Sequence, residues 1–199
     1  MKIKHFSKPF YHTIIYDYFD NIEFNSIKNE IEYLETNKLK NMWYDNDTHH
    51  KSLYDEFKVD SYYIDRIFEN VRNNSILLNS ITKIYNLNRE GFLDKTKNPL
   101  LNFINDSNSD STMLHSYKNG SSYYEHKDNA VLSFLYTFWD EPKEFIGGDL
   151  IFGAYKPKLK SNCCLIFPSY ELHQVTKVES KKLGIVRWSL NQRIYIENR

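Results

Sequence analysis

Residues 121–134 read SSYYEHKDNAVLSF, which places His126 and Asp128 two positions apart in front of an apolar run. Taken alone, an HxD pair is typical of an exposed loop, because both residue types usually lie at the surface. The surrounding sequence is more regular, since the pair closes the series YxxGxxYxxHxD that begins at Tyr117. An HxD pair that ends such a series and leads into a strand-like segment is a candidate for two of the ligands of a metal ion.

A third candidate ligand lies further along the chain. The segment LIFPSYELHQV, residues 165–175, delivers His173 at the start of another strand-like run. Two imidazoles and one carboxylate leave coordination positions open, and this ligand set is suited to non-haem Fe(II). Between these segments, FIGGDLIF contains Gly147 and Gly148, which we interpret as structural residues that let the backbone turn or approach another segment closely.

The sequence from Thr112 onward predicts a β-rich core. Short β-branched and aromatic runs are separated by turn residues at near-regular spacing, a pattern typical of a sandwich or barrel. The expected strands lie in TMLHSY, AVLSFLYTFW, GGDLIFGAY, NCCLIFP, HQVTKV and LGIVRWSLNQRIYI.

The first third of the chain reads as a strand followed by helices. HTIIYDYF, residues 12–19, is rich in β-branched and aromatic residues and predicts a strand. Apolar residues then recur at helical spacing between charged ones, which predicts an amphipathic helix over about residues 22–38. Its apolar positions are Phe24, Ile27, Ile31 and Leu34.

Further helices are expected before the β-rich part. NSITKIYNLN, residues 79–88, predicts a short helix, and the polar stretch 86–111 predicts a loop because its periodicity is weak. Another helix is expected where Asp60 and Ser61 offer N-terminal caps. The apolar stripe of that helix is Ile64, Ile67, Phe68 and Val71.

Length and composition favour one domain in an α+β, mainly β arrangement. The 199 residues can bury a substantial core, and we expect residues 1–110 to form a helical support for a core over residues 111–199. Lys and Arg number 26 and Asp and Glu number 26, so charge predicts no binding to nucleic acid or to an anionic membrane. The N-terminal sequence has no long apolar segment, which predicts a cytoplasmic protein. Cys163 and Cys164 are neighbours, and a bridge between them would be strained if they lie on a strand, so we expect two buried thiols.

These motifs together resemble those of the iron- and 2-oxoglutarate-dependent oxygenase superfamily, and within it the prolyl 4-hydroxylase-like branch. The resemblance covers about Leu114 to Leu190: the Y, G, Y, HxD series, the GG-containing run, the FP before the distal histidine, and a basic residue with a serine two positions later. It implies a double-stranded β-helix, or jelly roll. It also implies that His126, Asp128 and His173 bind Fe(II).

The resemblance further implies a cation that holds the distal carboxylate of 2-oxoglutarate. Arg187 in RWSL fits, because Ser189 lies on the same strand face and a guanidinium binds a carboxylate in a fork. Family members commonly place this cation nearer the distal histidine than the 14 positions found here. Lys182 is therefore the alternative, although it has Gly184 instead of serine two residues later.

Two tyrosines are also implied in the cosubstrate site. Tyr136 aligns with the family tyrosine that hydrogen-bonds 2-oxoglutarate, and Tyr117 is expected near the pocket. Aromatic residues in strands are as often part of the core, and this alternative stays open for both. No residue is expected to act as a proton-transfer base, and no catalytic residue is expected beyond the metal ligands.

The implied activity is a dioxygenase that uses Fe(II), 2-oxoglutarate and O2, supported by ascorbate, to hydroxylate a C–H bond with release of succinate and CO2. A prolyl residue in a protein or peptide is the favoured substrate, and a free amino acid or another small molecule is the alternative. Two other hypotheses remain: a non-catalytic jelly-roll binding module, and a metalloenzyme of the cupin type that uses no 2-oxoglutarate. The oligomeric state is not indicated by the sequence.

Other polar clusters are weaker candidates. YDNDTHHK, residues 44–51, has the density of Asp and Asn typical of an exposed turn, although with Trp43 it could also form a lid over the substrate. His5, His12 and His115 have no partners that the sequence makes visible. The possible metal ligands in YDNDTHHK are Asp45, Asp47, His49 and His50.

Overall fold

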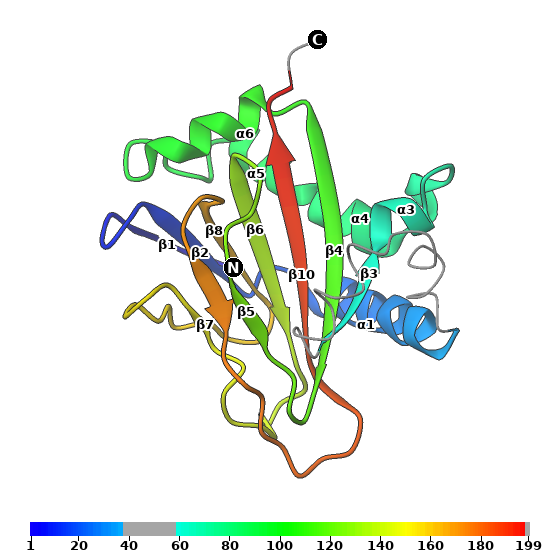
Figure 1. Cartoon of the computed structure of the whole chain (residues 1–199). Helices are drawn as coiled ribbons and strands as arrows, with labels where there is room; N and C mark the ends of the chain where they lie inside the picture. The colour runs from blue at the N-terminus through cyan, green and yellow to red at the C-terminus, as the bar shows by residue number, and fades with distance from the viewer. Residues whose placement is uncertain (38–58, 198–199) are drawn as a thin grey trace.

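Two antiparallel sheets form the body of the protein in the computed structural model, which describes residues 1–37 and 59–197. The large sheet has the order β1-β2-β8-β6-β10-β4-β3, and the small sheet has the order β5-β9-β7 (Figure 1). This is the jelly roll that the sequence predicts. The strands of the large sheet, in that order, are Lys2–Phe6, His12–Tyr16, Cys163–Pro168, Leu132–Phe138, Ile185–Tyr195, Ser109–Lys118 and Asp60–Tyr63; those of the small sheet are Tyr123–His126, His173–Val175 and Leu150–Ile151.

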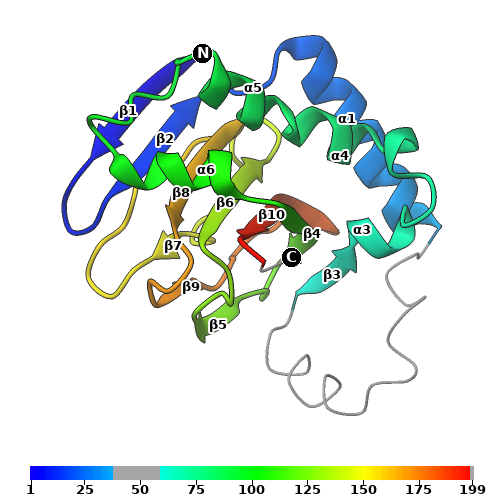
Figure 2. The ribbon, with the colours of Figure 1, turned by 90° about the horizontal axis from the view of Figure 1, so that it is seen from above.

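Helices cover the face of the large sheet that is turned away from the small sheet (Figure 2). Helix α1 begins with a capping box, in which the Asp20 side chain accepts from the main chain of Glu23 and the Glu23 side chain accepts from that of Asp20. Within the described residues, no helix has the length and apolar character needed to cross a bilayer. The helices are α1 (Asn21–Thr36), α3 (Ile64–Ile67), α4 (Ile76–Ile81), α5 (Lys83–Arg89) and α6 (Phe103–Asp106), with 3₁₀ turns at Arg72–Asn74 and Pro99–Asn102.

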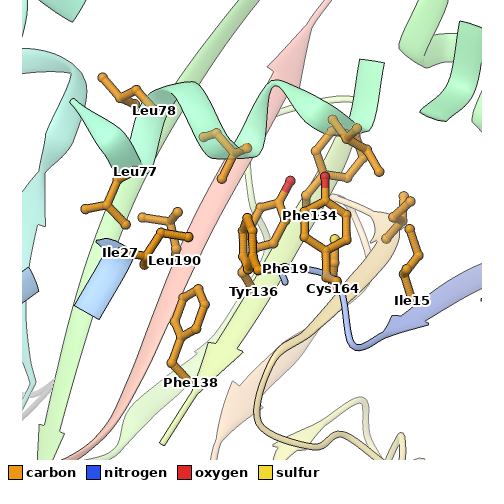
Figure 3. Close-up of a cluster of buried hydrophobic side chains, with 14 of the residues drawn as sticks. Ile15, Phe19, Ile27, Leu77, Leu78, Phe134, Tyr136, Phe138, Cys164 and Leu190 are labelled. Carbon is orange, nitrogen blue, oxygen red and sulfur yellow. The ribbon is translucent and has the colours of Figure 1, made fainter. Parts of the chain in front are cut away.

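The hydrophobic core has two layers, one on each face of the large sheet. Between the helices and this sheet, Ile27 of α1 and Leu77 of α4 pack near Leu190 of β10 (Figure 3). The second layer fills the space between the two sheets. Because successive side chains of a strand point to opposite faces, Cys163 belongs to the second layer and Cys164 to the first, as expected, and both thiols are free and buried.

The N-terminal part contributes more strands than the one predicted at residues 12–19. Strand β2 and helix α1 are confirmed, but β1 and β3 also join the large sheet. Asp60 and Ser61 are not helix caps: they pair with Ser116 and His115 of β4 as part of β3, and Tyr62 and Tyr63 behind them favour a strand. The apolar stripe that follows is helical for one turn only, Ile64–Ile67.

The helix predicted at residues 79–88 is confirmed as the pair α4 and α5, but the loop predicted at 86–111 is partly wrong. Pro99 begins a 3₁₀ turn that Asn98 caps through its side chain, and α6 follows directly. A proline after a capping residue is a helix-start signal, which the weak periodicity of this stretch had obscured. In the β-rich part, each expected run contains a strand, and β5 was not expected.

The double glycine of residues 147–148 lies where the chain enters the short strand β7. Both residues have positive φ, +69° at Gly147 and +64° at Gly148. A Cβ atom on Gly147 would lie 1.9 Å from the main-chain oxygen of Lys177. This position therefore requires glycine for its conformation and for the close approach of another segment.

We expect Gly147→Ala to destabilise the fold by about 3 kcal/mol, because left-handed strain adds to a clash with main chain that cannot rotate away. Gly91 is a matched control, since its φ is +80° but a Cβ atom there would meet open space. Gly91→Ala should cost about 1 to 2 kcal/mol, from the strain alone. Urea unfolding of both variants checks this, and equal midpoints would contradict the role of the close contact.

Candidate metal centre

Three side chains from the ends of two paired strands converge between the sheets. His126 ends β5, His173 begins β9, and the two are direct partners in the register of these strands. Their ring centroids are 4.3 Å apart. Asp128 follows in the turn after β5, where its main-chain N–H donates to the oxygen of Ser169 over 2.9 Å. One ligand atom from each of the three lies within 4.8 Å of the others, so the structure brings together the set that the sequence singled out.

Both imidazoles are oriented through Nδ1. In His126 this atom donates to the main-chain oxygen of Tyr124 over 2.9 Å, and in His173 to that of Glu171 over 2.7 Å. Nε2 of each ring then faces Asp128, at 3.6 Å and 3.8 Å from its two carboxylate oxygens. Burial, together with the neighbouring His126, lowers the pKa of His173 to about 4. The ring is therefore neutral at pH 7, which is the state that binds a metal ion.

The Asp128 carboxylate is buried and held on one side. Ser133 donates to its Oδ2 over 2.5 Å, and the Asn191 amide lies 3.4 Å from the same oxygen. Burial alone would raise the pKa of Asp128, but the His126 imidazole and the Arg193 charge outweigh it and keep this pKa well below its ordinary range. The charged carboxylate is thus the stable form.

The other oxygen of Asp128, Oδ1, is the one that faces His126. Arg193 Nη2 forms an ion pair with it at 2.9 Å, but without an aligned hydrogen bond, and Oδ1 has no hydrogen-bond partner among the described residues. A buried carboxylate oxygen without a hydrogen bond is costly unless something binds it. Together with two imidazole Nε2 atoms, it forms a donor set that fits a divalent transition metal.

Arg187 lies deeper between the sheets and is 1% exposed. Its guanidinium is stacked on the Tyr117 ring, with 4.4 Å from Cζ to the ring centroid, while Nη1 has no hydrogen-bond partner in the described part of the chain. It lines a cavity of about 250 Å³ together with Lys143 and Lys156. An unpaired guanidinium nitrogen in a buried, cation-rich cavity fits the carboxylate of a ligand.

A second, narrower cavity of about 20 Å³ adjoins the metal-ligand candidates. His126, His173, Tyr117 and Ser189 line it, and Leu150 lines both cavities, so the two are adjacent. The candidate ligands and Arg187 therefore line two neighbouring cavities that share Leu150.

Lys182, the alternative to Arg187, lies in a turn at the surface. Its Nζ forms ion pairs with Glu144 at 3.0 Å and Asp140 at 3.8 Å, and its side chain is 43% exposed. It lines neither cavity.

The expectation that Tyr136 lies in the cosubstrate site is wrong. Its side chain points to the helices, in the layer shown in Figure 3, and its hydroxyl donates to Gln192 Oε1 over 3.1 Å. The neighbouring residues on β6, Leu135 and Thr137, face the cavities instead. Neighbouring residues of a strand point to opposite faces of the sheet. An assignment shifted by one residue therefore placed a tyrosine of the core in the site.

Sequence reasoning missed two charged or titratable residues of this region, Arg193 and His115. The signal for Arg193 is present in RWSLNQR, where every second residue of β10 is polar and faces the space between the sheets. His115 lies two residues before Tyr117 on β4 and lines the narrow cavity.

The structure gives hydrogen-bond partners to the three histidines for which the sequence showed none. His5, His12 and His115 hydrogen-bond to Thr13, Tyr155 and Ser61, respectively. Tyr155 and Ser61 are far in sequence from the histidines that they contact, whereas Thr13 is only 8 residues from His5. The cluster at residues 43–50 lies outside the described residues.

Comparisons with known proteins agree with this picture. The 2OG-Fe(II) oxygenase superfamily matches residues 112–195. A PKHD-type hydroxylase of Aliarcobacter butzleri (strain RM4018) is 29% identical over 84 residues, which cover 34% of this chain and just 37% of that relative's length. A Pseudomonas putida prolyl-4-hydroxylase structure superposes with a TM-score of 0.61 at 12% identity, covering 94% of this chain and 93% of the other. The viral collagen prolyl hydroxylase of Paramecium Bursaria Chlorella virus-1 superposes with a TM-score of 0.53 at 15% identity, covering 92% of this chain and 96% of the other. At such identities the two structures show the shared fold.

Proposed function

From the match of residues 112–195 to the 2OG-Fe(II) oxygenase superfamily, we propose that the chain is a 2-oxoglutarate-dependent dioxygenase that hydroxylates a C–H bond. The observation that carries the proposal is the convergence of His126, Asp128 and His173, with their ligand atoms within 4.8 Å of one another and Asp128 Oδ1 without a hydrogen bond. When bound, Fe(II) with 2-oxoglutarate and O2 supplies the oxidising chemistry, and the protein supplies ligands, orientation and a dry site.

In this proposal each residue has a defined task. The two Nε2 atoms and Asp128 Oδ1 hold the ferrous ion, while Ser133 keeps the carboxylate oriented. Arg187 pairs with the distal carboxylate of 2-oxoglutarate, and Ser189 adds a hydroxyl on the same face of β10. Its buried Nη1, which lacks a partner in the described chain, supports Arg187 over the surface residue Lys182. Such a buried cation near the metal ligands also favours this activity over a cupin-type enzyme without 2-oxoglutarate.

A prolyl residue of a protein or peptide is the proposed substrate. Support comes from two solved structures of the same fold, whose names describe a prolyl-4-hydroxylase and a collagen prolyl hydroxylase. The named PKHD-type relative is a hydroxylase. A free amino acid or another small molecule is the second candidate, because substrate choice is made by loops around a shared scaffold.

Succinate formation from 2-oxoglutarate, with Fe(II) and ascorbate, tests the function directly. Turnover without a primary substrate would already separate an oxygenase from a binding module. A panel of proline-rich peptides and free amino acids, read out by a mass increase of one oxygen atom, then identifies the substrate class. A protein that binds Fe(II) but forms no succinate with any member of the panel would contradict the proposal.

The support of Asp128 gives a separate prediction. We expect Ser133→Ala to lower the affinity for Fe(II) or Mn(II) about tenfold, since the carboxylate loses the hydroxyl that orients it. Ser111→Ala is the matched control, because Ser111 bonds to the Tyr195 hydroxyl and does not touch Asp128. Anaerobic metal titration measures both variants, and an unchanged affinity in Ser133→Ala would remove Ser133 from the site.

A further inference from the structure

His115 is a buried histidine that the proposed mechanism does not use, although it lines the same narrow cavity as His126 and His173. It lies on β4, where it is the direct partner of Ser189 on β10, while Tyr117 is the partner of Arg187. Its place in the sheet is therefore one step from Arg187 toward the metal-ligand candidates.

A series of ring contacts shows the same position in space. Tyr123 lies against His126 with 4.7 Å between ring centroids and against His115 with 4.9 Å. His115 and Tyr117 follow at 6.5 Å, and the Arg187 guanidinium covers Tyr117 at 4.4 Å. The imidazole of His115 thus lies midway along a wall that runs from the candidate iron ligands to the candidate carboxylate anchor.

A hydrogen bond to one nitrogen of His115 orients the ring. Nδ1 lies 2.8 Å from the hydroxyl of Ser61 on β3, and this is the one hydrogen bond described for the ring. Burial, and then the charges of Arg193 and His126, lower the pKa of His115 to about 3, so the ring is neutral. When Ser61 donates to Nδ1, the proton of the neutral ring resides on Nε2, which then is a hydrogen-bond donor.

We propose that His115, oriented by Ser61, donates a hydrogen bond from Nε2 to 2-oxoglutarate between the metal ligands and Arg187. The inference rests on the proposed function, because it takes the ligand to be the dicarboxylate that bridges the two ends of this wall. It assigns β3, an edge strand of the large sheet, a part in cosubstrate binding through Ser61.

The test is an anaerobic titration of the Fe(II)-loaded protein with 2-oxoglutarate, followed by its charge-transfer absorption. We expect His115→Phe, which keeps a ring in the wall, to weaken 2-oxoglutarate binding about tenfold at unchanged affinity for Fe(II) alone. Ser61→Ala should weaken it by a smaller factor, and His115→Gln, whose amide can still donate, should retain most of the affinity. His5→Phe is the matched control, since its Nδ1 likewise bonds to a hydroxyl on a neighbouring strand, that of Thr13, away from the cavity.

Three results would overturn the inference. His115→Phe could bind 2-oxoglutarate like the wild type, it could lose Fe(II) affinity instead, or it could raise only the KM for the hydroxylated substrate. The first makes His115 structural, and the others assign it to the metal or to the substrate. If His115→Phe does not fold, a 2-oxoglutarate affinity of Ser61→Ala equal to that of the wild type would refute the role of the pair. A wild-type protein that binds Fe(II) but no 2-oxoglutarate refutes the proposed function itself.

Discussion

The His126→Ala protein is expected to form no succinate from 2-oxoglutarate and to bind Fe(II) more than about 100-fold more weakly than the wild type. Removing a residue that merely supports a metal ligand costs about 10- to 100-fold in affinity, so removing a ligand should exceed that range. Anaerobic metal titration and a succinate assay measure the two effects. His126→Ala is a suitable variant because the one hydrogen bond described for its side chain goes to a nearby main-chain oxygen, that of Tyr124.

A loss of activity through misfolding has to be separated from a loss of the metal. The free energy of unfolding of metal-free His126→Ala should fall by no more than about 2 kcal/mol, because the substitution removes one hydrogen bond and the imidazole that favours the charged form of Asp128. His5→Ala serves as the control, since His5 lies on β1 and bonds to Thr13. Succinate formation that survives in His126→Ala at the wild-type rate would show that the ligand assignment is wrong.

Arg187→Met should raise the concentration of 2-oxoglutarate needed for half-saturation by about 100-fold or more. Truncating one partner of a buried, hydrogen-bonded charge pair typically costs 2 to 5 kcal/mol, and about 2.7 kcal/mol corresponds to 100-fold. Arg187→Lys should lie between, because an ammonium group cannot bind both carboxylate oxygens in a fork. The same half-saturation measured for Lys182→Ala should match the wild type, because Lys182 is paired with Glu144 at the surface.

The metal-free Arg187→Met protein should be no less stable than the wild type. It loses the stacking of the guanidinium on Tyr117, which contributes about 1 to 2 kcal/mol. It also removes a charge whose Nη1 is buried without a hydrogen bond among the described residues, and such a group costs several kcal/mol. The second effect is the larger one. Urea unfolding of the metal-free proteins checks this prediction. In the half-saturation experiment, an increased 2-oxoglutarate requirement in Lys182→Ala, with none in Arg187→Met, would assign the carboxylate-binding role to Lys182.

The sequence predicted the sheet-rich core and the metal-ligand candidates because both leave patterns in short, continuous stretches of the chain. The HxD pair is local, and His173 was found because it stands at the start of a strand-like run. Helix α1 was predicted because its apolar stripe and its amphipathic spacing are continuous.

The remaining errors come from information that a linear pattern does not contain. Asp60 and Ser61 have the sequence pattern of helix caps. They form a strand because they pair with β4, which is far away in sequence, and such pairing cannot be seen in a local pattern. Tyr136 shows a second limit, because a run in which every residue of β6 is buried carries no alternation that would reveal which side chains face the site. His115 could not be recognised, since its partner Ser61 is 54 residues away.

Strand β10 presents Arg187, Ser189, Asn191 and Arg193 to the space between the sheets, and its intervening residues pack toward the helices. A single-codon deletion inside this strand would therefore reverse the facing of every residue beyond it, exchanging polar groups for Leu190 and Ile194. The number of residues in β10 is therefore as constrained as the identity of any one of them.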